Sequence, residues 1–109
     1  MEARKIELKT VAMELREEQK EADVLDYRKL LTEVMRVQQQ GMSFEDMEIA
    51  VRVIGDLKRA NGAVLIQESD YEYLWKRVQA LRPLVADPAL LEFRNAVRDA
   101  PKVVVEAKG

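Results

Sequence analysis

The segment Ser43 to Gln67, SFEDMEIAVRVIGDLKRANGAVLIQ, carries a helix start, a long apolar face, a helix stop and a strand-like run. The Ser43 hydroxyl can accept from amides of the first turn, and the acidic residues that follow it suit the positive end of a helix dipole. Asn61 and Gly62 tolerate positive φ and therefore end helices. The segment predicts a helix over about 43–60 followed by a strand over 63–67, which we interpret as the central strand of a sheet.

The apolar positions of this helix recur at spacings of three and four, which is typical of an amphipathic helix. They are so numerous that we expect burial on more than one side; they are Phe44, Met47, Ile49, Ala50, Val51, Val53, Ile54 and Leu57. Gly55 interrupts the helix at a cost of about 1 kcal/mol relative to Ala. We expect another element to pack closely against it.

The N-terminal part of the chain predicts a strand over about 4–12. Ile6 and Leu8 alternate with Lys5, Glu7 and Lys9, a period of two with charge on the outer face. This pattern is typical of a charged edge strand. The charged run over 14–23 buries little apolar surface, so we interpret it as an exposed helical turn or a mobile connection.

Three further helices and a last strand complete the prediction. A helix over about 25–40 takes Asp23 or Asp26 as its cap and ends before Gly41. The sequence Ser69-Asp70-Tyr71-Glu72 has the form of a capping box for a helix over about 70–82, and Asp87-Pro88 opens a helix over 88–98. Residues 102–107 include three consecutive valines and predict a strand. The expected fold is a single α+β domain over 1–109, with a three-stranded sheet covered by three to four helices.

Composition excludes several classes of function. The chain has 109 residues, no Cys, no His and a net charge of −2 from 18 basic and 20 acidic residues. Without His or Cys, the commonest general base and the thiolate nucleophile are absent, and the four glycines form no phosphate loop. The mixed charge lacks the basic stripe of a nucleic-acid-binding protein, and no apolar run is long enough to span a bilayer. We therefore expect no enzyme, no cofactor, no metal, no nucleic acid and no membrane, and a cytoplasmic location or a place in a virion.

The helices over 25–40 and 43–60 have the outline of a helix-turn-helix. The second helix begins with Glu45, Asp46 and Glu48, where a recognition helix offers donors to base edges. These carboxylates would repel phosphates, which argues against DNA binding.

Two groups of residues are candidates for contact with a partner protein. Tyr71, Tyr73 and Trp75 cluster on one predicted helix, where they either line the core or form an aromatic contact patch. Lys5 and Lys9 mark the predicted edge strand, which could accept a strand from a partner.

The order of FEDM, RVIGDL, ESDYEYLWKRV and LLEFRNAV followed by AP resembles small proteins of tailed bacteriophages and prophages that are encoded among virion structural genes. The resemblance covers about Phe44 to Pro101 and implies a non-catalytic accessory of virion assembly. The function that we expect is thus a protein–protein interaction or assembly module, with another protein or further copies of itself as partner. The alternative is a small regulator or inhibitor that binds a single host protein.

Overall fold

The computed structural model of the chain describes residues 1–14 and 24–105. Four helices are described: α1 (Tyr27–Arg36), α2 (Phe44–Arg59), α3 (Glu68–Gln79) and α4 (Pro88–Arg98). The strands are β1 (Glu2–Glu7), β2 (Thr10–Ala12), β3 (Val24–Asp26), β4 (Ala63–Gln67) and β5 (Lys102–Val104). The expected α+β class is confirmed. The expected charged connection falls largely on 15–23, outside the described residues, as does the end of the expected last strand.

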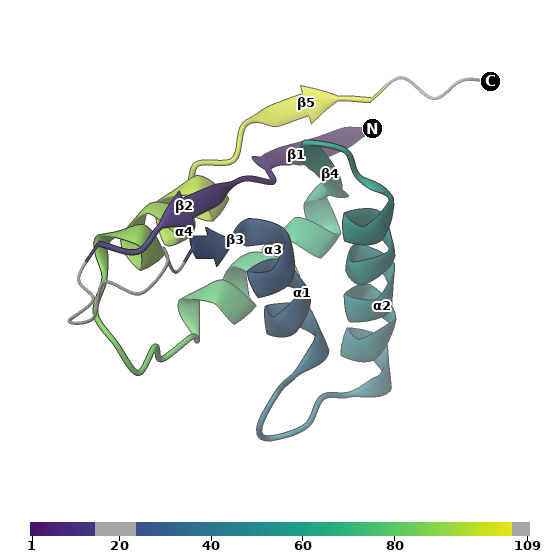
Figure 1. Ribbon diagram of the computed structural model, residues 1–109. Helices are drawn as coiled ribbons and strands as arrows, with labels where there is room; N and C mark the ends of the chain where they lie inside the picture. The colour runs from purple at the N-terminus through teal and green to yellow at the C-terminus, as the bar shows by residue number, and fades with distance from the viewer. Residues whose placement is uncertain (15–23, 106–109) are drawn as a thin grey trace.

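The main sheet is antiparallel with the order β4-β1-β5, and the helices gather on one side of it (Figure 1). The prediction that β1 is an edge strand and β4 a central one was wrong. β1 lies in the middle because it pairs along its length with β4, from Ala3–Gln67 to Glu7–Ala63, and at its start with β5. Alternation reveals which residues face the helices but not how many neighbouring strands there are.

The predicted strand over 4–12 is divided between two sheets. The Leu8 amide still donates to the Gly62 carbonyl at 2.8 Å, whereas the Lys9 carbonyl accepts from the Tyr27 amide at 3.0 Å. The backbone thus passes from hydrogen bonding with Gly62, beside β4, to hydrogen bonding with Tyr27, beside β3, within two residues. Beyond this point β2 pairs with β3, with Val11 opposite Leu25.

Helix α1 is shorter than predicted at both ends. Residues 24–26 pair as β3, and Asp26 becomes the cap, its carboxylate accepting from the Lys29 amide at 3.3 Å. At the other end Val37 is extended, and the amide of Gly41 (φ 78°) closes a turn onto the Gln38 carbonyl at 2.9 Å. The intervening glutamines offer no apolar face to bury, so a local turn replaces the last helical turn.

The caps of α2 and α4 confirm the sequence prediction, and that of α3 does not. Ser43 accepts from the Asp46 amide at 3.1 Å, and Asp87 from the Ala89 amide at 2.9 Å. Helix α3 instead begins directly after β4, with Gln67 as a cap residue that makes no side-chain hydrogen bond. Ser69 therefore lies inside the first turn, and the buried Asp70 carboxylate accepts hydrogen bonds from Arg52.

One apolar cluster joins the sheet to all four helices. Its largest fully buried side chains include Tyr27 and Phe93, whose rings meet edge to face with centroids 5.1 Å apart. Ile6 and Val64, which are paired across β1 and β4, close the cluster from the side of the sheet. The remaining members are mostly aliphatic, as the low aromatic content predicts.

Candidate interaction surface on helix α2

Helix α2 buries only one side, contrary to the prediction of burial on more than one side. Ala50, Val53 and Leu57 are buried, and Ile54 packs partly against the core. Phe44, in contrast, is 83% exposed, Met47 41% and Val51 63%. The helix lies at the margin of the fold, beside α1 (Figure 1). The exposure of these three side chains shows that the outer part of its broad apolar face is uncovered. The periodicity predicted an apolar face correctly but could not show how much of it the other elements cover.

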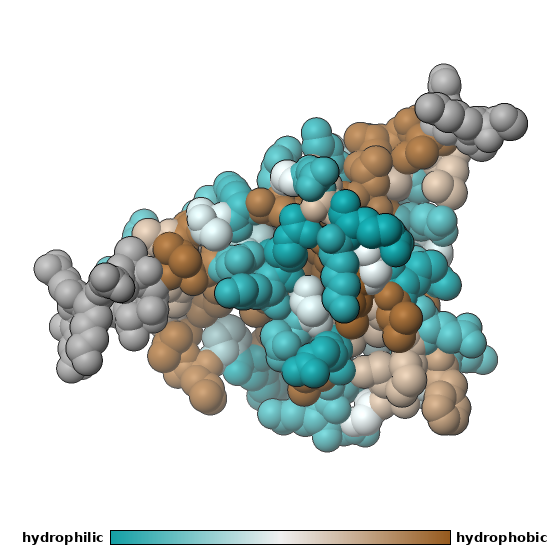
Figure 2. Space-filling view, turned by 45° about the vertical axis from the view of Figure 1, so that its right-hand side comes forward, coloured by the Kyte–Doolittle hydropathy of each residue, from teal (hydrophilic) through white to brown (hydrophobic). Residues whose placement is uncertain are grey.

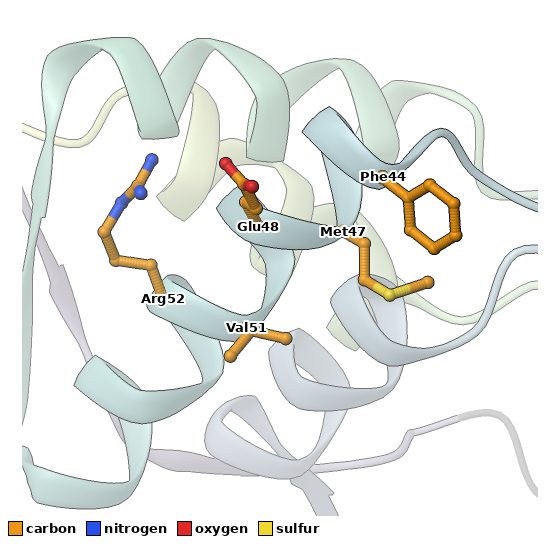
Figure 3. Close-up of a pocket in the computed structure, with 5 residues that line it drawn as sticks. All are labelled: Phe44, Met47, Glu48, Val51 and Arg52. Carbon is orange, nitrogen blue, oxygen red and sulfur yellow. The ribbon is translucent and has the colours of Figure 1, made fainter.

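The exposed apolar side chains border a shallow, open depression lined by Phe44, Met47, Glu48, Val51 and Arg52. Met47 and Val51 project together on one side of α2, whereas Glu48 and Arg52 project on the other side, toward α3 (Figure 3). Apolar side chains with hydrophilic neighbours are also visible in the space-filling view, at the lower right, where α2 begins (Figure 2). An apolar surface with a polar rim is typical of a protein-interaction site.

Arg52, which lines the depression, joins α2 to α3. Its guanidinium donates two hydrogen bonds of 2.8 Å each to the carboxylate of Asp70, whose side chain is 2% exposed. These hydrogen bonds, followed by the charge of Asp70, raise the pKa of Arg52 above its usual value. Arg52 is therefore a fixed edge of the surface. The pattern Ser69-Asp70-Tyr71-Glu72 concealed this role, because it suggested a capping function for the same residues.

Gly55 lies on the same face as the exposed residues, four positions after Val51. The three atoms nearest to a Cβ placed on Gly55 would all belong to the side chain of Arg59, the closest at 3.3 Å. The expected close packing of another element is thus wrong. Gly55 also lacks the positive φ that Gly41 and Gly62 require. Within the described chain, neither packing nor backbone conformation explains a glycine here.

The exposed charged residues of α2 are segregated along its length. Glu45 and Glu48 lie in the first half, Lys58 and Arg59 in the last turn. Arg59 pairs with Asp56 at 3.0 Å but keeps 73% of its side chain exposed. Glu45, Glu48 and Lys58 form no ion pair with any residue in the described ranges. The exposed charges are thus acidic in the first half of the helix and basic in the second, where the half-buried Asp56 is paired with Arg59.

The predicted aromatic patch on α3 is largely part of the core. Tyr71 is 5% exposed, and its hydroxyl donates to the Val97 carbonyl at 2.6 Å. Tyr73 and Trp75 are half-buried and pack against the core cluster, and burial, followed by the charge of Asp46, raises the pKa of Tyr73. Tyr71 therefore belongs to the core lining, and the other two present only part of their rings.

The two candidate lysines do not mark a free edge. Lys5 is exposed, but β1 is paired on both sides at its start, so β1 cannot accept a partner strand there. Lys9 lies between β1 and β2, 3.3 Å from Glu92 and 5.7 Å from the ring centre of Tyr27. The outer edges of the main sheet belong instead to β4 and β5.

A second apolar patch lies where the chain enters α4. Leu84, Val85 and Leu91 are exposed around a shallow depression in this loop and the first turn of the helix. This patch combines loop and helix residues and lacks the segregated charges of α2. It is the weaker candidate for a defined docking geometry.

Within residues 1–14 and 24–105, no group of three or more acidic side chains is arranged to hold a metal ion. None of the helices in these ranges is both long and apolar enough to cross a membrane. Comparison of the chain with protein-family models, with curated proteins and with solved structures found no match.

Proposed function

We propose that the protein is a non-catalytic protein–protein interaction module whose docking surface is the outer face of α2. The observation that carries the proposal is the exposure of Phe44, Met47 and Val51 side by side on a regular, well-packed helix. Exposed apolar residues on a fixed helix favour helix-in-groove or helix-on-helix recognition, in which little ordering is needed on binding.

The setting proposed for this interaction is the assembly of a tailed-phage virion. Its support is the resemblance of Phe44 to Pro101 to small proteins encoded among virion structural genes. FEDM, the first motif of that resemblance, spans Phe44 to Met47 and therefore includes two of the exposed apolar residues. The surface and the resemblance thus coincide in one turn of α2.

Photo-cross-linking tests the proposal. A photoreactive phenylalanine analogue replaces Phe44 in the full chain, expressed in the cells that encode it, and the control carries the analogue at Arg94, an exposed position on α4. We expect a protein adduct from position 44 that is absent from position 94 and is lost when Val51→Glu is added. Equal adducts at both positions, or none at position 44, would refute the proposal.

The identity of the cross-linked protein separates the two kinds of binding function. A virion structural protein, or a second copy of the chain, supports the assembly role. A single soluble host protein would instead identify a regulator or inhibitor.

A further inference from the structure

We propose that the outer face of α2 binds the same face of a second copy of the chain, as an antiparallel helix pair related by a two-fold axis at Val51. This inference rests on the proposed function and names its partner. Most homo-oligomers of soluble proteins have such symmetry, and a two-fold interface requires a surface that is complementary to itself. The residues of α2 meet this requirement in their spacing, their size and their charge.

Spacing fixes one register. In an antiparallel pair centred on Val51, a residue that follows Val51 by a given number of positions lies opposite the residue of the second copy that precedes Val51 by the same number. Phe44 then lies opposite Lys58, Met47 opposite Gly55 and Val51 opposite its own copy. These five positions are spaced three and four apart, so they share one face of the helix.

Size complementarity explains the glycine. The long Met47 side chain of one copy enters the space left by Gly55 of the other. The nearest atoms to this space within the chain belong to the flexible end of Arg59. Small residues opposite large ones allow two helices to approach closely, as knobs fit into holes. A helix-weakening residue that the single chain does not need thus acquires a role in the pair.

Charge complementarity fixes the direction. Glu45, Glu48, Arg52 and Arg59 lie on one flank of the exposed face. An antiparallel two-fold pair sets this flank against itself in reverse order. Glu45 then lies close to Arg59 of the second copy, and Glu48 close to Arg52. A parallel two-fold pair would instead set this flank against the other flank of the helix, where Ala50 and Ile54 lie, and would form neither contact. The phenyl ring of Phe44 meets the Lys58 side chain, whose ammonium group suits an aromatic face.

The shared surface is one face of one helix, so we expect a reversible dimer with a dissociation constant in about the micromolar range or weaker. Sedimentation equilibrium of the full chain, from micromolar to about millimolar concentration, should show monomer and dimer in exchange. Val51→Glu should weaken self-association about tenfold or more, because it places two carboxylates at the centre. Val51 is 63% exposed, so circular dichroism should show that this variant folds normally.

A charge exchange tests the direction. Glu45→Lys and Arg59→Glu should each weaken self-association by about threefold to tenfold, because each creates two like-charge contacts per dimer. Mixing the two variants should give heterodimers, since both of their contacts then join opposite charges. The double variant should recover self-association. If the single variants lose self-association and mixing them does not restore it, the antiparallel register is overturned.

A disulfide tests the centre. The chain has no natural cysteine, so Val51→Cys places a single thiol at the two-fold axis. Mild oxidation should give a covalent dimer, whereas the exposed control Arg94→Cys should remain monomeric. A chain that stays monomeric at all concentrations, or a dimer that Val51→Cys does not cross-link, overturns the inference. If the position-44 photo-cross-linker then captures a different protein, the proposed function survives without the dimer; if it captures nothing, both fail.

Discussion

The guanidinium of Arg4 in β1 donates two hydrogen bonds, of 2.9 and 3.0 Å, to the carboxylate of Glu68 at the start of α3. A third, of 2.9 Å, reaches the Ala100 carbonyl, and the guanidinium carbon lies 4.5 Å from the ring centre of Tyr71. Bidentate pairing of this kind is the strongest form of carboxylate contact that arginine makes. One side chain thus joins the N-terminal strand to α3 and to the segment that leads into β5.

This ion pair predicts a loss of stability in acid. The hydrogen bonds from Arg4 lower the pKa of Glu68 below its ordinary value of 4.5. Because the folded state has the lower pKa, the stabilisation is complete above the unfolded value and is lost as the pH falls through the folded value. Melting temperature measured from pH 7 to pH 3 should therefore fall less steeply for Glu68→Gln than for the wild type. Glu72→Gln, at an exposed position in the same helix, should retain the wild-type slope.

Two buried tyrosine hydroxyls should respond oppositely to removal. The Tyr27 hydroxyl is buried without a hydrogen-bond partner among the described residues, whereas that of Tyr71 donates to Val97 and Arg98 carbonyls. Tyr71→Phe should cost about 0.5–1.5 kcal/mol in the free energy of unfolding, and Tyr27→Phe should be neutral or stabilising. Urea denaturation of both variants makes the comparison. A larger cost for Tyr27→Phe would show that its hydroxyl has a partner.

Gly55→Ala should stabilise the isolated chain by up to about 1 kcal/mol, because alanine restricts the unfolded chain and favours helix. The nearest neighbour of the added methyl group is the movable end of Arg59, which can shift to admit it. Thermal unfolding at low chain concentration, where self-association does not contribute, measures the effect. Gly62→Ala is the matched control: Gly62 has a φ of 72°, so the same change should destabilise there. A destabilised Gly55→Ala chain would mean that the glycine is required within a single copy.

The Arg52–Asp70 pair should show strong coupling. The substitution Arg52→Met leaves the buried carboxylate of Asp70 without its partner, which should lower the free energy of unfolding. Asp70→Leu combined with Arg52→Met should recover part of this loss, because the buried charge is gone as well. A double-mutant cycle in urea gives the coupling energy directly. Additive effects would show that the two side chains do not support each other.

The sequence predicted those parts of the fold that local chemistry decides. Ser43, Asp26 and Asp87 cap helices, and the strand after Gly62 begins where expected, because caps and positive φ depend on a few neighbouring residues. Features that depend on distant neighbours were wrong. Val51 looked like a core residue because its neighbours in the sequence are apolar, yet 63% of it is exposed. Asp70 looked like part of a capping box because Arg52, its partner, lies in another helix.

The candidate site was accordingly less accessible to sequence reasoning than the fold. Tyr71 drew attention as an aromatic residue, but its hydroxyl serves the end of α4. Two features of the sequence could have indicated α2 as the site. Its apolar face is wider than a helix at the margin of a small domain can bury, and a glycine interrupts that face. Both features suggest a second molecule only when the single-chain packing is known.

The central position of β1 has a consequence for synthesis on the ribosome. Strand β1 precedes both of its neighbours in the chain, so it must wait for Ala63–Gln67 before it gains one neighbour and for Lys102–Val104 before it gains the other. Until then its backbone donors and acceptors are available to water or to chaperones, and the sheet closes only after Lys102–Val104 have left the ribosome. Nascent chains arrested before residue 102 should therefore be more sensitive to protease than the released protein.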